Sequence, residues 1–310
     1  MRERIDVLRQ ALPQLIRTAV LRAAPDLPWR LDGCVYQYTR FEALLAMVGG
    51  PIVRPSAAKQ PMSELWATSS VHLNDSQEFT RGREVIAKAL PILPKDEVTR
   101  RMTRAVHDAD ALEVYCTCFS GVDDDLSQWR GYGADGTGVC IEFDLRKLIE
   151  GLDGVGCWLI YGKPNDKSEL TQVAVAEKLV TYIHRSIATA LPPGRVPEAV
   201  YSEVREQLAE IWSALFLVFK HQDFCAENEF RIVYSSAVGR TIEPAFRPDS
   251  VVPFVPLQMT SGKALPVTAI RLGPAVSTDI NVRSLELLLS RLKLGDRIRV
   301  TKSDIPYVPR

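Results

Sequence analysis

The sequence predicts an α+β fold, with a mixed and mostly antiparallel sheet core, helices around it and a helical insert. Two short runs of β-branched, cysteine and aromatic residues, 114–120 and 139–143, flank a turn-rich loop, which is typical of strands. Apolar residues recur at helical spacing over much of residues 168–222. Strand-like runs then return at 224–234, 267–273 and 297–301. We therefore expect one α+β domain over residues 31–310, with the insert at about 168–222.

The composition is that of an ordinary globular chain. Its 310 residues are 46% hydrophobic and 25% charged, a balance that argues against disorder. Lys plus Arg equals Asp plus Glu at 38 each, so the chain has no overall attraction to nucleic acid or to an anionic membrane. No apolar run approaches the roughly 20 residues that span a bilayer. We expect no membrane partner.

The six cysteines are scattered, and the first residues do not have the apolar core of a signal peptide. A reducing cytoplasm is the expected location. Cys116 and Cys118 share one face of a predicted strand, but no second Cys/His pair has the spacing of a zinc site. We therefore interpret the cysteines as small buried residues and predict no bound metal.

The first elements are a helix, a strand and a second helix. Apolar residues at helical spacing over 5–24 predict an N-terminal helical extension within residues 1–30. We expect this helix to mediate self-association or to hold a partner. A strand over 33–39 follows, with Thr39 as the N-cap of a helix over 41–48.

A short strand over 65–69 precedes a polar loop, and the next helix begins near Asp75. Asn74, Asp75 and Glu78 gather at the start of this helix. One interpretation is a cap and an acidic first turn that satisfy free amides and the helix dipole. The other is contact with a substrate. The sequence leaves both open.

The segment 95–110 is polar and basic, and it precedes the strand over 114–120. The loop beyond that strand is expected to display four side chains, and we expect chemistry here more than elsewhere. These residues are Gln128, Trp129, Arg130 and Tyr132.

The glycines of residues 131–136 match the G-x-G-x-x-G pattern of dinucleotide-binding loops. In that fingerprint the glycines lead from a strand into a helix whose N-terminus faces the pyrophosphate. Here they lead into the strand-like run 139–143. We therefore interpret them as turn residues.

The remaining elements follow from the same patterns. In order, they are a helix-sized piece after residue 144, a strand over 157–161, one helix through Val173 to Ile183, a break at 192–194, a longer helix through Val200 to Val218, a strand over 224–234, an irregular connection over 238–262, a strand over 267–273, a helix over 282–292 and a strand over 297–301.

Glu227, Glu229 and Arg231 alternate along the strand predicted at 224–234, so a regular strand points all three to one face. They form either an ion-pair ladder or a site in which a carboxylate meets developing positive charge on a substrate. Cleavage of a ribosyl bond passes through such a cationic state. No serine, histidine and acid have the spacing of a catalytic triad.

Four pieces of this chain resemble a bacterial and phage family, domain of unknown function 2971. They are Tyr36-Gln-Tyr-Thr39, Leu73-Asn-Asp-Ser-Gln-Glu-Phe79, the set Cys118-Phe-Ser120, Trp129-Arg-Gly-Tyr132 and Gly138-Val-Cys-Ile-Glu-Phe143, and Glu227-Asn-Glu-Phe-Arg231. The similarity spans residues 33 to 308.

The family's layout is similar to that of toxin-like ADP-ribosyltransferases, and this resemblance implies a fold of that type. It also implies that Glu229 is the catalytic carboxylate, that Glu227 guides the acceptor and that Tyr132 stacks on nicotinamide. Tyr38 or Thr39 would face the ribose of NAD. The other candidate cofactor-binding residues are Tyr36, Asn74, Asp75, Glu78, Ser120, Gln128, Trp129, Arg130 and Arg231.

The function that this resemblance implies is cleavage of the nicotinamide–ribose bond of NAD, in antiphage defence or as a toxin. The partners would be this nucleotide and a macromolecular acceptor. One alternative is a metal-assisted nuclease or nucleotide hydrolase that uses Asp75, Glu78 and the pair Glu227 and Glu229. Another is a non-catalytic ligand sensor or interaction module.

Overall fold

The structure is a computed structural model, and it describes residues 32–48, 61–74, 77–109, 112–152, 154–191, 198–235, 242–246 and 251–308. The N-terminal extension predicted over 1–30 lies outside these ranges, and so does Asp75. The described part of the chain has the α+β fold that the sequence predicts.

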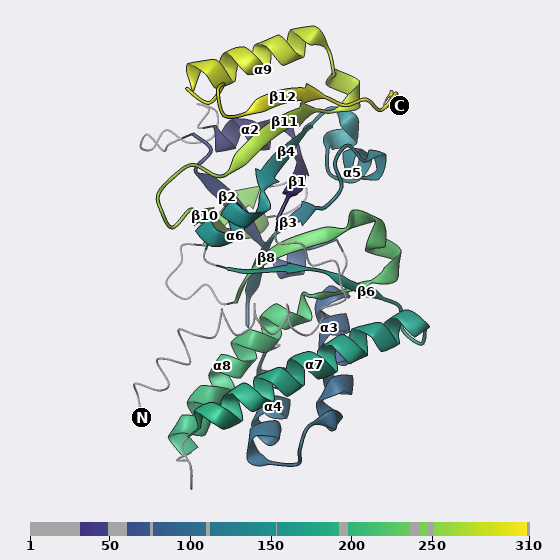
Figure 1. The fold of residues 1–310 in the computed structure, drawn as a ribbon, viewed down its shortest axis with the longest axis vertical. Helices are drawn as coiled ribbons and strands as arrows, with labels where there is room; N and C mark the ends of the chain where they lie inside the picture. The colour runs from purple at the N-terminus through teal and green to yellow at the C-terminus, as the bar shows by residue number, and fades with distance from the viewer. Residues whose placement is uncertain are drawn as a thin grey trace.

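One mixed, mostly antiparallel sheet runs through the molecule (Figure 1). Its strands in the described ranges are β1 (Cys34–Thr39), β2 (Glu64–Ser69), β3 (Val114–Ser120), β4 (Val139–Asp144), β5 (Val155–Trp158), β8 (Glu229–Ser235), β9 (Glu243–Phe246), β10 (Val251–Gln258), β11 (Val267–Leu272) and β12 (Arg299–Lys302). The order is β12-β11-β4-β1-β3-β2-β10-β9, and β8 pairs with both β3 and β5. β11 and β12 are parallel.

The sheet branches at β3. β8 pairs with β3 along its whole length, so β1 and β2 share the other edge. β1 meets that edge at Ser120, whereas β2 meets it at Tyr115 and Cys116. A second, two-stranded sheet pairs β6 (Ile160–Gly162) with β7 (Phe219–His221) in parallel.

Helices cover both faces of the sheet (Figure 1). The helices are α2 (Phe41–Met47), α3 (Glu78–Ala89), α4 (Glu97–Asp108), α5 (Leu126–Gly131), α6 (Leu145–Gly151), α7 (Lys167–Ala190), α8 (Glu198–Phe216) and α9 (Asp279–Arg291). α3, α4, α7 and α8 gather at one end of the molecule, and α9 lies at the other. α7 and α8 fill most of the segment predicted as a helical insert.

The two faces of the sheet border two separate cores. Alternate residues of β3 point to opposite faces: Val114 and Cys116 pack with α3, α4, α7 and α8. Tyr115 and Phe119 pack on the other side with α2, α6 and α9. A strand that is buried on both faces explains the continuous apolar run that predicted it.

The glycine-rich segment is a turn, as predicted. It passes through a 3-10 helix, η4 (Ala134–Gly136), into β4 rather than into an α-helix. Gly136 has a φ of 81°, a conformation that favours glycine. A Cβ on Gly138 would lie 2.2 Å from the Thr39 carbonyl oxygen, so the backbone of β1 requires a glycine there.

The polar and basic segment 95–110 contains a helix that the sequence pattern did not reveal, α4. Asp96 caps it by accepting a hydrogen bond from the Thr99 amide. Its buried face includes Val98 and Met102, but charged residues lie between them along the chain. The helical spacing was therefore difficult to see.

The prediction of an irregular connection over 238–262 is wrong in part, because β9 and β10 form there. Proline removes a hydrogen bond from the ladder and argues against a strand. Pro253 and Pro244 nevertheless lie opposite each other in this pair of strands. The pairing of β10 with β2 on its other edge supplies the context that the local sequence lacks.

Two smaller predictions are also corrected. Thr39 is not the N-cap of α2; that position is Arg40, which makes no side-chain cap hydrogen bond. The strand predicted over 157–161 is divided, since β5 ends at Trp158 and β6 begins at Ile160.

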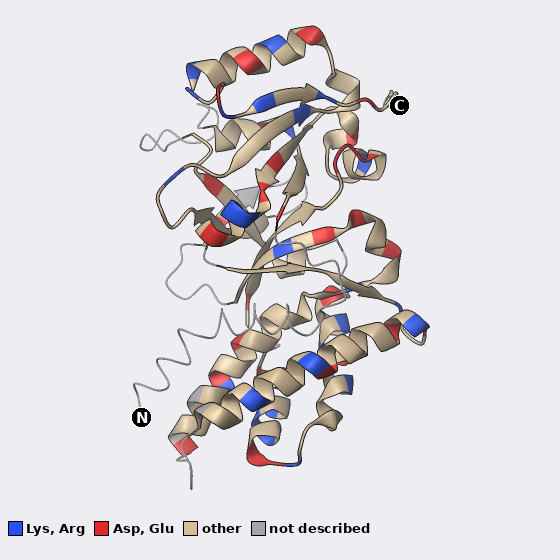
Figure 2. Cartoon of the chain, in the orientation of Figure 1, with Lys and Arg blue, Asp and Glu red and all other residues tan. Residues whose placement is uncertain are grey.

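Lys, Arg, Asp and Glu are interspersed over the described helices and strands (Figure 2), in keeping with the equal numbers of acidic and basic residues. Among the described residues, no helix has the length and apolar character to cross a membrane.

Candidate functional site

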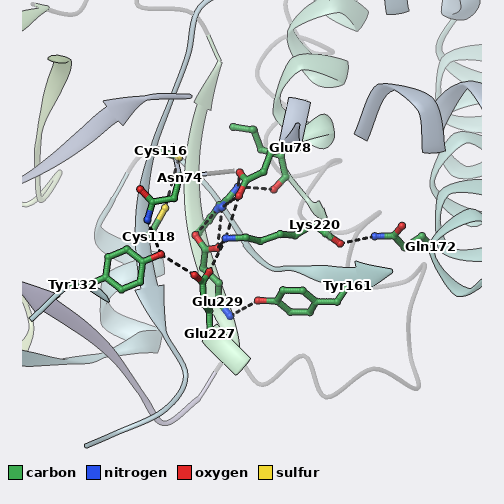
Figure 3. A network of polar contacts seen from close by, with 12 residues as sticks. Asn74, Glu78, Cys116, Cys118, Tyr132, Tyr161, Gln172, Lys220, Glu227 and Glu229 are labelled. Carbon is green, nitrogen blue, oxygen red and sulfur yellow. Dashed lines mark hydrogen bonds and ion pairs between the residues drawn. The ribbon is translucent and has the colours of Figure 1, made fainter. Parts of the chain in front are cut away.

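Five charged side chains from three parts of the chain meet inside the molecule (Figure 3). We call them the buried ion cluster: Glu78, Lys220, Glu227, Glu229 and Arg231. Glu78 is the first residue of α3, Lys220 lies in β7, and Glu229 and Arg231 lie in β8. Glu227 ends a 3-10 helix, η5 (Gln222–Glu227), just before β8. The spacing of Glu229 and Arg231 in a strand therefore places both in one site.

Arg231 is the centre of the cluster and is only 1% exposed. Its Nη1 and Nη2 atoms donate to the two oxygens of Glu78 at 2.5 and 2.8 Å. Its Nε and Nη2 atoms donate to the two oxygens of Glu229 at 2.6 and 2.9 Å. The planar guanidinium suits such paired contacts. Arg231 therefore ties α3 to β8.

Lys220 joins all three carboxylates. Its Nζ lies 2.6 Å from Glu227 Oε2, 2.8 Å from Glu229 Oε2 and 3.1 Å from Glu78 Oε1. Burial by itself would lower the pKa of Lys220, but Glu229, Glu78 and Glu227 outweigh it and raise the pKa. The ammonium therefore stays charged inside the protein.

Glu229 is buried and ionised. Burial would raise the pKa of this carboxyl, but Arg231 and Lys220 outweigh that effect, and its pKa falls to about 2. Both of its oxygens are occupied by these cations. Its backbone amide donates to the Tyr161 hydroxyl at 2.8 Å. Arg231 and Lys220 thus fix the carboxylate, and Tyr161 fixes the backbone beside it.

Glu227 lies at the edge of the cluster, and its side chain is 17% exposed. The Tyr132 hydroxyl, at the end of α5, donates to Glu227 Oε1 at 2.8 Å and accepts from Asn74 Nδ2 at 3.0 Å (Figure 3). Burial and Glu227 raise the pKa of Tyr132, which keeps the phenol protonated. Tyr132 itself is 37% exposed. Asn74, Tyr132 and Glu227 therefore form the solvent-facing rim of the cluster.

The backbone beside Glu227 is fixed by two contacts. Ser120 Oγ donates to the Glu227 carbonyl at 2.9 Å, and the Gly121 amide donates to the Asn228 carbonyl at 2.7 Å. Asn228 is left-handed, with a φ of 41°. The strand predicted to start at residue 224 starts only at Glu229, because the chain turns here. This turn places the Glu227 side chain at the rim of the cluster.

The charges of the cluster do not balance. Three carboxylates, Glu78, Glu227 and Glu229, face two cations, Lys220 and Arg231. One formal negative charge is in excess, and Glu227 is the carboxylate nearest to solvent. A cationic group on a ligand would find its complement at this rim.

Two predicted site residues instead build a packing unit. The rings of Tyr38 and Trp129 meet edge to face with their centres 4.8 Å apart, and Trp129 is fully buried. The Tyr38 hydroxyl donates to the Val122 carbonyl and accepts from the Asp125 amide. The expectation that the loop displays Trp129 is therefore wrong. These residues hold α5, and with it Tyr132, against the sheet.

Other predicted residues also lie apart from the cluster. Thr39 ends β1, Gln128 is buried in α5, and Arg130 is exposed on the same helix. The expectation that the loop displays Gln128 is wrong as well. Tyr36 lines a separate hollow. Within the described ranges, no hydrogen bond or ion pair joins these four residues to the cluster.

Sequence reasoning missed Lys220 and Tyr161. Lys220 directly follows the apolar run 214–219. A charged residue at the end of such a run is the sequence feature that could have indicated a buried charge. Tyr161 accepts a hydrogen bond from the Glu229 amide. No local sequence pattern predicts this contact, because the two residues are far apart in the chain.

No group of three or more His, Cys, Asp or Glu that could hold a metal ion is found in the described chain. The thiols of Cys116 and Cys118 lie 3.9 Å apart beside the cluster. Their mutual hydrogen bond and their burial raise the pKa of Cys118 well above its ordinary value. The Cys118 thiol is therefore protonated at neutral pH.

Acid is expected to weaken the fold through Glu229. Its pKa is about 2 in the folded chain, against an ordinary value of 4.5. Ionised Glu229 therefore stabilises the fold above about pH 4.5 and loses this contribution as the pH falls towards about 2, a loss of about 3 kcal/mol. The check is the free energy of unfolding from urea titrations between neutral and acid pH. We expect the free energy of unfolding to fall more steeply with decreasing pH in the wild-type protein than in Glu229→Gln. The variant gives the contribution of the other carboxylates, and the difference between the two slopes is that of Glu229. Equal slopes would contradict this account.

Comparison with known proteins identifies a family for this region. The family described as "Protein of unknown function (DUF2971)" matches residues 128–232. This match confirms the family predicted from the motifs, over a stretch that contains Tyr132, Lys220, Glu227, Glu229 and Arg231. No curated protein and no solved structure matches the chain.

Proposed function

We propose that the protein cleaves the nicotinamide–ribose bond of NAD and transfers the ADP-ribosyl group to water or to a macromolecular acceptor. The observation that carries the proposal is Glu227: a half-buried carboxylate, hydrogen bonded to Tyr132, at the exposed edge of a cluster with one negative charge in excess. A fixed negative charge is the feature that stabilises a cationic transition state most effectively.

The proposed reaction needs little from the protein beyond this electrostatic site. The bond between C1′ of the ribose and the nicotinamide nitrogen breaks, and its electron pair leaves with nicotinamide, which becomes neutral. The ribose is left with oxocarbenium character, as in glycoside hydrolysis. A water or an acceptor nucleophile then bonds to C1′ and loses a proton. Glu227 would stabilise the cationic ribose or hold one of its hydroxyl groups.

The geometry supports Glu227, rather than Glu229, as the group that meets the substrate. Glu229 is buried, and both of its oxygens bind Arg231 and Lys220. Glu227 keeps an exposed edge and is held by a single Lys220 contact and by Tyr132. Glu229 is then a positioning residue, which keeps the charge of Lys220 next to Glu227.

Tyr132 and Asn74 would complete the site. The ring of Tyr132 is partly exposed beside Glu227, where it can stack on the nicotinamide ring of the substrate. The Asn74 amide is tied to the Tyr132 hydroxyl and is itself exposed. A polar donor next to an aromatic face suits a ring that carries a carboxamide.

The geometry gives less support to a metal-assisted hydrolase. Such a site needs carboxylates that are free to bind divalent ions. Glu78 and Glu229 are instead saturated by Arg231 and Lys220. A metal would have to displace two buried cations to reach them.

Nicotinamide release tests the proposal. The purified protein is incubated with NAD, with and without a bacterial cell extract as the source of acceptors, and nicotinamide is measured by chromatography. We expect release in the presence of a metal chelator. No release under any of these conditions would overturn the proposal. Activity that appears only with divalent metal would favour the hydrolase, and a rise in melting temperature with NAD but without turnover would favour a sensor.

The biological setting follows from the same chemistry. An enzyme that consumes NAD or modifies a macromolecule in the cytoplasm would act as a toxin or as an effector of antiphage defence. Expression of the protein in a bacterial host, with and without Glu227→Gln, separates a toxic activity from the effects of overproduction.

A further inference from the structure

A polar hollow on the sheet lies apart from the buried ion cluster. Its volume is about 250 Å³, and it opens over β1, β4, β11 and β12. Ligand pockets for drug-sized molecules measure roughly 300–1,000 Å³. The hollow therefore has room for one fragment of a dinucleotide and not for the whole.

The register of the strands explains the hollow. Tyr36, Glu142, Ala269 and Arg299 lie opposite one another on four neighbouring strands. Cross-strand neighbours share one face of the sheet, so these four side chains form a row. Ala269, which is small and buried, makes the floor, and the larger side chains of its neighbours make the walls.

The lining is polar but electrically balanced. Arg271 donates from Nε and Nη2 to both oxygens of Asp123, at 3.0 and 2.7 Å, and from Nη1 to the Lys302 carbonyl. Arg299 lies 3.7 Å from Glu142 and is 72% exposed. Two cations and two carboxylates therefore line the hollow. A neutral group with both donors and acceptors fits this lining better than a phosphate does.

Tyr36 adds an aromatic wall to the hollow. A nucleobase stacks on an aromatic side chain whatever its identity, because every base has a π-face. Tyr36 lies beside Glu142 across β1 and β4, so a stacked base would meet hydrogen-bonding groups at its edge. An uncharged nucleoside has this combination of a flat ring and polar edges.

The same cross-strand row continues to the buried ion cluster. Tyr36 lies opposite Ser120, and Ser120 lies opposite Glu229. Neighbouring strands are about 4.8 Å apart, so Tyr36 lies ~10 Å from Glu229 on one face of the sheet. Ser120 also contacts the Glu227 carbonyl. The hollow and the ion cluster therefore lie at two ends of one row of the sheet, with the buried Ser120 between them.

The geometry points to a nucleoside-binding subsite in this hollow, which takes the adenosine end of the substrate while Glu227 meets the nicotinamide riboside end. This inference rests on the proposed function for the identity of the substrate. The subsite itself rests on the volume, the balanced polar lining and the wall formed by Tyr36.

Equilibrium binding of adenosine tests the subsite without any turnover. Binding to the full-length protein is measured by calorimetry, and the fold of each variant is checked by its melting temperature. Ala269→Leu fills the floor of the hollow, whereas Ala269→Ser nearly preserves its volume. Tyr36→Ala removes the aromatic wall from a partly exposed position, and it serves if the leucine variant fails to fold.

We expect adenosine to bind the wild-type protein, with a dissociation constant at least tenfold weaker in Ala269→Leu and in Tyr36→Ala. Ala269→Ser should stay within about twofold of the wild type. Failure of adenosine to bind, or equal binding to all variants, would overturn the inference. Adenosine binding without nicotinamide release would leave the subsite standing and defeat the proposed function. If Ala269→Leu releases nicotinamide with the wild-type KM for NAD, the subsite is overturned and the proposed function stands.

Discussion

Replacement of Arg231 by methionine is expected to lower the free energy of unfolding by about 3–5 kcal/mol, because it leaves buried carboxylates without their cation. Arg231 is 1% exposed and binds both oxygens of Glu78 and of Glu229. Lys220 would be the sole cation left in the cluster to face three acids. The check is a urea titration at neutral pH.

Two further variants sharpen this measurement. Arg291→Met, at an exposed position at the end of α9, controls for the loss of an arginine and should change stability by less than about 0.5 kcal/mol. In Glu78→Met combined with Arg231→Met, one charge of each sign is removed together. We expect this double variant to be more stable than Arg231→Met alone, with an interaction energy of about 1–3 kcal/mol. A loss below about 1 kcal/mol for Arg231→Met would show that the cluster is solvated and not buried.

Glu227→Gln is expected to lower kcat for nicotinamide release by about 100- to 1,000-fold, the effect of removing one group that stabilises charge in a transition state. The amide has the same size and can still accept a hydrogen bond from Tyr132. The melting temperature should fall little, because the side chain lies at the edge of the cluster and is 17% exposed.

The matched control for this variant is Glu150→Gln, an exposed acid on α6. It should keep the wild-type kcat and KM. A Glu227→Gln protein with wild-type kcat would remove Glu227 from the reaction. A raised KM with unchanged kcat would assign it to uniform substrate binding.

The regular elements were predictable wherever a short segment carries its own pattern. β1, β3, β4 and β11 follow from runs of strand-forming residues. α7 and α8 follow from long apolar stripes at helical spacing. Strands β9 and β10 were missed because their prolines argue against a strand locally, and only the pairing of β10 with β2 overrides that preference.

The site was predictable only in part, for a physical reason. The two-residue spacing of Glu229 and Arg231 placed both on one face, and Tyr132 was selected from a cluster of polar and aromatic residues. Spacing does not reveal burial, so the isolation of Glu229 from solvent and the packing of Trp129 were not foreseen. Lys220 enters from β7, which pairs with β6 in a separate small sheet. That contact depends on tertiary structure alone.

The most direct test of the central claim is the rate of nicotinamide release by Glu227→Gln and by Glu229→Gln, each divided by the amount of folded protein. Glu227 meets the substrate in this account, and Glu229 positions it through Lys220. The folded fraction of Glu229→Gln should therefore be at least tenfold more active than Glu227→Gln. An inactive but folded Glu229→Gln protein, beside a Glu227→Gln protein with the wild-type rate, would contradict the account and return the catalytic role to Glu229.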